Sequence, residues 1–454
     1  MKRKVIIALF EGGLLVKPER IKYQLTALVI LTWVSLSFAQ SPDTVKLNQF
    51  FDRLAEKNQA MGSLYITKDG KVEYTRSIGF SQITSAEKKP LTNNTKYRIG
   101  SVTKMFTTAM IFQLINEGKL KLSDTLDRFF PQIPNAEKIT ISQLLGHRSG
   151  IPDLTDGSGK MNPKTQSEIL AIIAKGTPDF EPDAKYTYSN SGFVVLGFII
   201  ENITGTPYQD NLNKRICAKI GLRDTYLGTE YTDINKNESF SYRYVGDWKQ
   251  EPETHLSIAG GAGAVISTPA DLAKFIQALF DGKIVSQESL SHMIQNNLGM
   301  ETFSYNSKTF YGHTGGIDNF GSWLVYSPEE KLVVSYSSNA KVYPVTQIID
   351  GVFNIYYDKP FTIPAFESIV ISSEVLERYV GVYSSPEAPV KFTITQEGSG
   401  LVVQMPNKSL HPLEPLAQDK FRIGSAPIEF LFNVDKNEMI IFRNGNEKVF
   451  IKEK

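Results

Sequence analysis

Two hairpin signals that are far apart in the sequence constrain the fold of this chain more than any other feature. The first, GSLYITKDGKVEYTRSIG from Gly62, joins two alternating runs through Asp69-Gly70, a dipeptide that favours a tight two-residue turn. The second, SWLVYSPEEKLVVSYSSN, turns around Pro328 to Lys331. Because the residues between them have helical spacing, we expect one antiparallel sheet built from both ends of a domain and covered by helices, an α/β (α+β) architecture.

The middle of the chain predicts an all-helical subdomain. Apolar residues recur at helical spacing after Ser101, and Gly118 is a natural end for that helix. A second helix signal is STPADLAKFIQALFDG, in which Ser267 or Thr268 is the cap, Pro269 opens the first turn and Gly282 ends the helix.

The C-terminal part of the chain has a different pattern. We expect the core domain to span 45–357, and the proline-bearing segment 358–372 to be a linker. Short alternating runs then fill residues 373–454, a pattern typical of a small β-barrel or sandwich.

The N-terminus and the composition predict export. Residues 1–39 contain a lysine, a short apolar run and small residues before a cleavage point at Ala39, which is the layout of a secretory signal. The apolar run is too short for a stable membrane span. A net charge of +1 argues against nucleic-acid partners. The single Cys217 excludes an intramolecular disulfide, and the five histidines lack ligand spacing, so we expect no metal and no cofactor. We therefore predict a secreted or periplasmic bacterial protein.

A serine and a lysine at the start of the first helix are the best candidates for chemistry. Ser-x-x-Lys occurs at Ser85, Ser101 and Ser338, but only the pair Ser101–Lys104 opens a predicted helix. Residues three apart share one face of a helix, so the lysine nitrogen can lie beside the serine hydroxyl. A serine becomes a useful nucleophile only when a neighbouring base takes its proton.

Two further motifs supply partners, Tyr188-Ser189-Asn190 and His313-Thr314-Gly315. With Ser101–Lys104 they resemble, in order and context, the serine β-lactamase and penicillin-binding-protein superfamily, closest to class C β-lactamases, DD-peptidases and related esterases. The resemblance implies that Ser101 is acylated, that Lys104 and Tyr188 share the general acid and base work, and that Asn190 binds substrate. It implies that His313, Thr314 and Gly315 line the substrate along a strand, and that the backbone N–H groups of Ser101 and Gly316 form the oxyanion hole. The final strands, with LERYVGVYSS, resemble the lipocalin-like domain of some of these peptidases.

The resemblance implies a secreted serine hydrolase that forms an acyl-enzyme on peptide, amide or ester bonds of small molecules, short peptides or peptidoglycan fragments. His313 stands where β-lactamases have lysine, which favours a DD-peptidase or D-amino-acid-specific peptidase over a β-lactamase or carboxylesterase. An imidazole changes charge near pH 6.5, so we expect His313 to bind a substrate carboxylate best when protonated. A non-catalytic sensor that is acylated without turnover is the remaining alternative. His147 and Cys217 are interpreted as structural residues.

Overall fold

The two hairpins join in one antiparallel sheet, as predicted. In the computed structural model, which describes residues 42–153, 162–366, 369–406, 409–424 and 428–453, the strand order is β10-β11-β12-β13-β1-β2. The strands are β1 (Ala60–Lys68), β2 (Lys71–Ile78), β10 (Glu301–Tyr305), β11 (Lys308–Ile317), β12 (Phe320–Ser327) and β13 (Leu332–Lys341). The first and last hairpins therefore pair through β1 and β13, with Leu64 opposite Tyr336. The proposed signal peptide lies outside the described residues.

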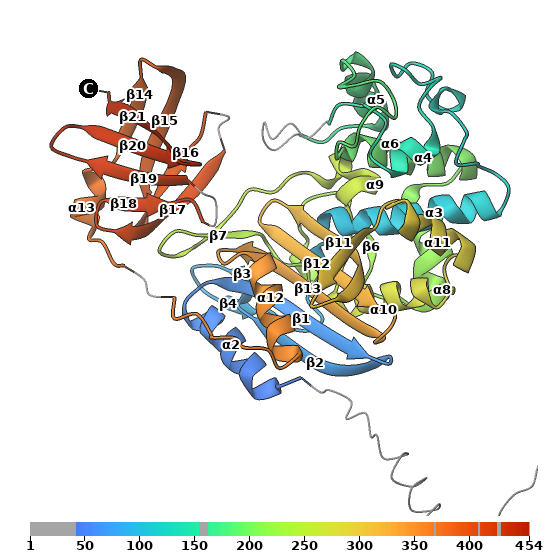
Figure 1. Ribbon diagram of the computed structural model, residues 1–454, viewed down its shortest axis with the longest axis horizontal. Coiled ribbons are helices and arrows are strands. Elements are labelled where there is room, and N and C mark those ends of the chain that lie inside the picture. Colours follow the sequence, from blue (N-terminus) through green and yellow to red (C-terminus); the bar gives the residue numbers. More distant parts are fainter. Residues whose placement is uncertain (1–41, 154–161, 367–368, 407–408, 425–427, 454) are drawn as a thin grey trace, which may run out of the picture. The chain divides into compact units, whose positions relative to one another are not determined.

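Helices cover both faces of this sheet (Figure 1). On one face, α2 (Thr44–Glu56) and α12 (Val345–Tyr356) bury their apolar sides against sheet residues such as Leu64 and Val334. On the other, α3 (Thr103–Asn116) and α10 (Pro269–Phe280) share a core with Leu324 and Val333. Helix α10 starts as expected, because the Thr268 side chain accepts a hydrogen bond from the Asp271 amide.

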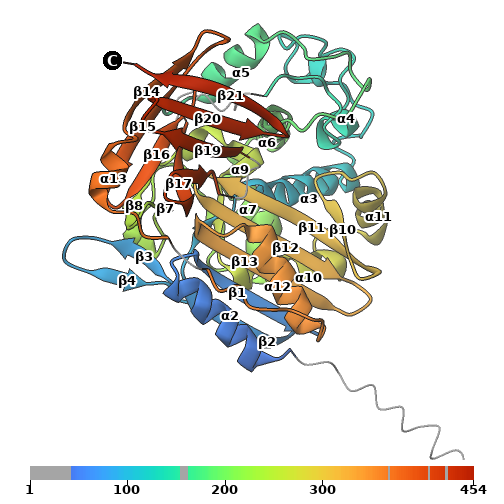
Figure 2. The same cartoon turned by 60° about the vertical axis from the view of Figure 1, so that its left-hand side comes forward.

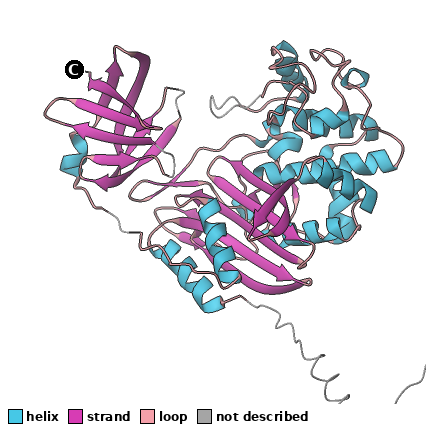
Figure 3. Cartoon of the chain, viewed as in Figure 1, coloured by secondary structure: helices cyan, strands magenta, loops and turns pink. Residues whose placement is uncertain are grey.

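The helical subdomain lies between the two halves of the sheet in sequence, and Figure 3 shows it as the region richest in helix. Its α-helices are α4 (Ile141–Leu145), α5 (Gln166–Lys175), α6 (Asn190–Thr204), α7 (Tyr208–Leu212), α8 (Ala218–Ile220), α9 (Gly260–Gly263) and α11 (Gln287–Gln295). Single-turn helices are η1 (Gly100–Val102), η2 (Leu126–Arg128), η3 (Asn213–Cys217), η4 (Ile234–Lys236) and η5 (Leu256–Ile258). Cys217 is buried among these helices, as a structural residue should be.

Three small sheets lie outside the six-stranded sheet and the barrel. They pair β3 (Phe80–Ile83) with β4 (Lys88–Pro90), β5 (Tyr97–Arg98) and β6 (Tyr226–Leu227) with β9 (Val265–Ser267), and β7 (Tyr242–Tyr244) with β8 (Trp248–Gln250). Strand β5 leads directly into the Ser101 turn, and its pairing with β9 fixes the start of that turn to the rest of the fold.

The C-terminal strands form a closed barrel, which settles the alternative between barrel and sandwich. After α13 (Ser373–Glu377) the strands are β14 (Gly381–Ser385), β15 (Ala388–Glu397), β16 (Gly400–Gln404), β17 (Leu410–Ala417), β18 (Lys420–Arg422), β19 (Ile428–Asn433), β20 (Glu438–Arg443) and β21 (Asn446–Lys452). Pairing of β14 with β21 closes the barrel, and Figure 2 shows the strands curving around a common interior. That interior is filled by side chains such as Ile394, Leu401 and Phe430.

Within the described parts of the chain, no helix combines the length and apolar character needed to cross a membrane. The same parts contain no group of three or more His, Cys, Asp or Glu side chains placed to hold a metal ion.

Candidate active site

The candidate nucleophile lies on a tight turn between β5 and α3. Gly100 has φ +52, and a Cβ built on it would lie 2.6 Å from the Gly316 amide nitrogen. Only glycine tolerates both the left-handed backbone and this approach. The turn therefore brings Ser101, which is partly exposed, against the last residues of β11.

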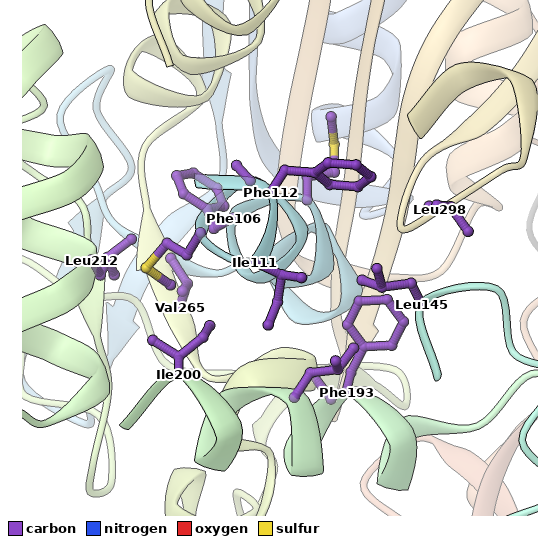
Figure 4. Close-up of a cluster of buried hydrophobic side chains, with 14 of the residues drawn as sticks. Phe106, Ile111, Phe112, Leu145, Phe193, Ile200, Leu212, Val265 and Leu298 are labelled. Atoms are coloured by element: carbon purple, nitrogen blue, oxygen red, sulfur yellow. The ribbon is translucent and has the colours of Figure 1, made fainter. Parts of the chain in front are cut away.

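Helix α3 is buried on every side, and this burial lowers the pKa of Lys104. Its residues from Thr103 to Leu114 are all buried. In Figure 4, Phe106, Ile111 and Phe112 project from the helix in different directions among side chains of the surrounding elements. The lysine one turn after Ser101 therefore has no path to bulk water along the helix, and its side chain is fully buried.

The Lys104 amine lies at the centre of the motif residues. Its Nζ is 2.9 Å from Ser101 Oγ, 2.8 Å from Asn190 Oδ1 and 3.0 Å from the Ala262 carbonyl oxygen. Burial lowers the pKa of Lys104 from 10.5 to about 7, while the charges of Asp153 and Glu301 oppose that change. Loss of hydration disfavours the charged form of an amine, so near pH 7 about half of the molecules hold Lys104 neutral.

Tyr188 contacts the same hydroxyl from the other side. Its phenol oxygen lies 2.6 Å from Ser101 Oγ, and burial raises its pKa well above 10. The ring stacks on His147 at a centroid distance of 4.4 Å, and His147 Nδ1 accepts a hydrogen bond from the Ser189 amide. His147 is buried and its pKa is lowered to about 3, first by desolvation. The interpretation of His147 as structural agrees with these contacts, which hold Tyr188 in place.

Asn190 is the first residue of α6 and is held from two directions. Its Oδ1 accepts from Lys104, and its Nδ2 donates to Asp153 Oδ2 at 3.0 Å. Because these contacts fix which end of the amide faces Lys104, the nitrogen end cannot turn toward the lysine. Asp153 was not among the predicted residues, although it directly follows the SGIP segment of the sequence.

His313 is more buried and more weakly basic than the sequence led us to expect. Its side chain is only 3% exposed, and burial, with the nearby charge of Lys104, lowers its pKa to about 4. Its Nδ1 lies 2.5 Å from the Thr314 carbonyl oxygen, which can only accept, so Nδ1 carries the proton. The expectation of a charge change near pH 6.5 was wrong, because a histidine within a strand next to a buried lysine loses both its hydration and its tolerance for positive charge.

The remaining residues of the third motif lie along the end of β11. A Cβ built on Gly315 would be 2.0 Å from the Ile99 carbonyl oxygen and 3.3 Å from the Ser101 nitrogen, so the two backbone segments are in direct contact. Thr314 and Gly316 are at least partly open to solvent. The sequence motifs are therefore brought together around Ser101, and of the three residues of the third motif only His313 is buried.

A cavity of about 460 Å³ adjoins this strand. Thr314, Gly315, Trp323 and Lys341 are among the residues that line it, and the barrel contributes Ile423 and Gly424. Lys341 Nζ donates to the Asp318 carbonyl oxygen at 3.2 Å and lies 3.9 Å from a Cβ built on Gly316. The cavity thus provides space and one ammonium group beside the predicted substrate strand.

The fold and this cluster together define the class of β-lactamase-fold serine hydrolases. The β-lactamase family model matches residues 47–352, and the chain belongs to that family. Penicillin-binding protein 4* of Bacillus subtilis (strain 168) is 26% identical over 448 residues, which cover 90% of this chain and 98% of that protein.

Two solved structures show the same relationship. A D-amino acid amidase from Ochrobactrum anthropi SV3, solved with D-phenylalanine, is 28% identical with a TM-score of 0.63, and the match covers 69% of this chain and 99% of that one. The octameric penicillin-binding protein homologue from Pyrococcus abyssi has a TM-score of 0.62 over 90% of this chain and 100% of its own, and at 24% identity it shows the fold alone.

Proposed function

We propose that this protein is a serine amidase or peptidase in which Ser101 is acylated and Lys104 is the general base. The observation that carries the proposal is the position of a fully buried amine, with a pKa of about 7, at 2.9 Å from the Ser101 hydroxyl. A base is most effective when its pKa lies near the working pH.

The contacts of Lys104 suit its neutral form. A neutral amine has two N–H donors and one lone pair, and the Asn190 and Ala262 oxygens are both acceptors at 3.0 Å or less. When these two oxygens take the two N–H donors, the lone pair is left for the Ser101 proton. Asn190 therefore orients the base in addition to its proposed contact with substrate.

Tyr188 is better suited to donate a proton than to remove one. Its raised pKa keeps the phenol protonated at neutral pH, and its oxygen lies within hydrogen-bond distance of Ser101 Oγ. We assign it the transfer of a proton to the leaving group. The resemblance implied that Lys104 and Tyr188 share the acid and base work. In this proposal Lys104 is the base and Tyr188 is the acid.

The reaction then has two halves. Ser101 Oγ bonds to the carbonyl carbon while its proton passes to Lys104, and the resulting oxyanion is bound by the N–H groups of Ser101 and Gly316. The tetrahedral intermediate expels the amine or alcohol, which takes a proton from Tyr188, and the proton held by Lys104 then returns to the phenolate, so that both groups regain their starting protonation. Water next attacks the acyl carbon while Lys104 accepts the water proton, and the second tetrahedral intermediate releases Ser101 Oγ, which takes that proton back from Lys104.

The neutral histidines of the site favour uncharged amide substrates over penicillins, which carry a carboxylate. His313 and His147 have pKa values of about 4 and 3, so neither provides a cation for a carboxylate at neutral pH. The likeness to a D-amino acid amidase supports the same class. DD-peptidase activity is the second candidate, because Lys341 places an ammonium group at the cavity beside β11 and this group can bind a terminal carboxylate.

We propose that residues 1–39 direct secretion or export to the periplasm, in line with the bacterial relative. Peptidoglycan fragments are then accessible substrates. A β-lactamase or esterase activity, or an acylated sensor without turnover, remains an outcome of the experiment below.

A labelling experiment tests the proposal. A fluorescent fluorophosphonate should label the wild type and Ser85→Ala, which keeps the active site and removes the serine of a surface Ser-x-x-Lys. Ser101→Ala should not be labelled, and equal labelling of both variants would refute the assignment. Rates with a D-amino acid amide, a D-Ala-D-Ala peptide, a p-nitrophenyl ester and nitrocefin then rank the substrates. Labelling without turnover of any of them would favour the sensor.

A further inference from the structure

A buried arginine lies three residues before the proposed nucleophile. Arg98 is 2% exposed and ends strand β5. Its Nη2 donates to Glu253 Oε2 at 2.7 Å, and its Nη1 donates to the Thr254 carbonyl oxygen at 2.6 Å and lies 3.4 Å from Asp318 Oδ2. None of these four residues was singled out from the sequence.

The two carboxylates are as buried as the guanidinium and are themselves held in place. The Glu253 and Asp318 side chains are 5% and 4% exposed. Asp318 also accepts from the Thr254 amide at 3.1 Å and from the Thr254 hydroxyl at 2.8 Å. Glu253 accepts from Thr232 at 2.9 Å. Directed bonds from one arginine therefore tie its own segment to two others, at 253–254 and at 318, which makes three joined segments.

Two of those segments carry the proposed oxyanion-hole amides. Arg98 is three residues before Ser101, and Asp318 is two residues after Gly316. Between these points the backbones touch, as the close approach of Gly100 to the Gly316 nitrogen shows. A change in the Arg98–Asp318 contact must therefore be absorbed by the short stretches that hold the two amides.

Fold stability alone does not require this arrangement. Buried ion pairs are poor stabilisers, because desolvation of the charges offsets much of their attraction, and apolar residues of similar volume often serve as well. What a guanidinium adds is geometry: its planar fork fixes two partners in two set directions, which a lysine cannot do.

We propose that Arg98, held between Glu253 and Asp318, is a positioning residue that sets the spacing of the Ser101 and Gly316 amides, so that the oxyanion hole is formed before substrate binds. The inference rests on the proposed function of Ser101. Preorganised donors lower the barrier because they need no rearrangement as charge develops on the substrate oxygen.

The test compares three variants at a temperature well below the melting temperature of each. Asp318→Asn keeps the shape of the side chain and removes its charge, and Arg98→Lys keeps the charge and removes the fork. Glu117→Gln is the matched control, because it weakens a partly buried Arg215–Glu117 pair of 2.6 Å that contacts none of the proposed catalytic groups. The measurements are kcat and KM for a p-nitrophenyl ester, and Ki for phenylboronic acid, which forms a tetrahedral adduct with serine.

Asp318→Asn and Arg98→Lys should each lower kcat about tenfold or more, as partial misplacement of an oxyanion donor predicts. KM should change little, Ki should rise in parallel with the loss in kcat, and Glu117→Gln should match the wild type. If either folded variant loses thermal stability but keeps kcat and Ki, Arg98 is only structural and the inference is wrong. A fall in kcat with unchanged Ki also overturns it. Failure of the proposed function would appear separately, as wild-type protein that the fluorophosphonate does not label at Ser101.

Discussion

The pH dependence of ester hydrolysis tests the assignment of Lys104 as the base. Burial lowers its pKa from 10.5 to about 7, which corresponds to about 5 kcal/mol of lost preference for the charged form. If the neutral amine is the reactive form, kcat/KM should be half-maximal near pH 7 and fall about tenfold for each pH unit below it. A solvent-exposed lysine would be neutral in fewer than about one in a thousand molecules at pH 7.

A single substitution should move this midpoint in a known direction. The charge of Asp153 raises the pKa of Lys104, so Asp153→Asn should shift the midpoint to lower pH. Asparagine can still accept the hydrogen bond that Asn190 donates to Asp153, so the geometry should be retained. Tyr188→Phe is the control: it should lower kcat about a hundredfold without moving the midpoint. Phenylalanine keeps the ring that lies over Lys104 Nζ, and the charges that shift the pKa of Lys104 are those of Asp153 and Glu301.

The assay is release of p-nitrophenol from an ester, followed between pH 5 and 10 at a wavelength where phenol and phenolate absorb equally. Stability of each variant across that range is checked by circular dichroism. A profile that rises through pH 9 to 10, or an Asp153→Asn midpoint at or above that of the wild type, would refute the reasoning.

Three further predictions address stability and substrate choice. The lysine binds fewer protons in the folded chain between pH 7 and 10.5, so wild-type stability should rise with pH across that window. Lys104→Met should therefore raise the melting temperature most at pH 7 and below, and an unchanged melting temperature at pH 6.5 would contradict this. Lys341→Met should raise KM several-fold for a D-Ala-D-Ala peptide, by the loss of one charge-assisted contact, and leave KM for a neutral ester unchanged; equal effects on both would argue against a carboxylate site. A chain ending at Asp358 should still be labelled at Ser101 but change its preference among larger substrates, because the barrel contributes Ile423 and Gly424 to the cavity; loss of labelling in a folded truncation would count against this.

The sequence predicted the elements whose signals are local. The Asp69-Gly70 turn and the Thr268 cap are both present. Turn chemistry and apolar periodicity depend on neighbours within a few residues, so they can be interpreted without the tertiary structure. The three motifs were found for a related reason, because each is contiguous in sequence.

Residues that act through distant contacts could not be found in this way. Asp153 meets Asn190 across a separation of 37 residues, and Arg98 meets Asp318 across 220. Glu301 influences Lys104 only because β10 pairs with β11. A lone carboxylate or arginine has no periodic signal, and its role depends on the topology that brings the segments together.

Burial is also a property that could not be assigned from the sequence, and it affects the protonation of three active-site groups at once. It favours a neutral Lys104, a neutral Tyr188 and a neutral His313, through the same loss of hydration acting on an amine, a phenol and an imidazole. A neutral amine can accept the Ser101 proton and a neutral phenol can donate one, so both catalytic tasks are available near neutral pH. The same loss of hydration removes the cation that the third motif would otherwise present to a carboxylate. Any change that admits water beside α3 should therefore raise the pKa of Lys104, which lowers its neutral fraction near pH 7, and should also raise the pKa of His313. The two effects cannot be tuned separately by exposure alone.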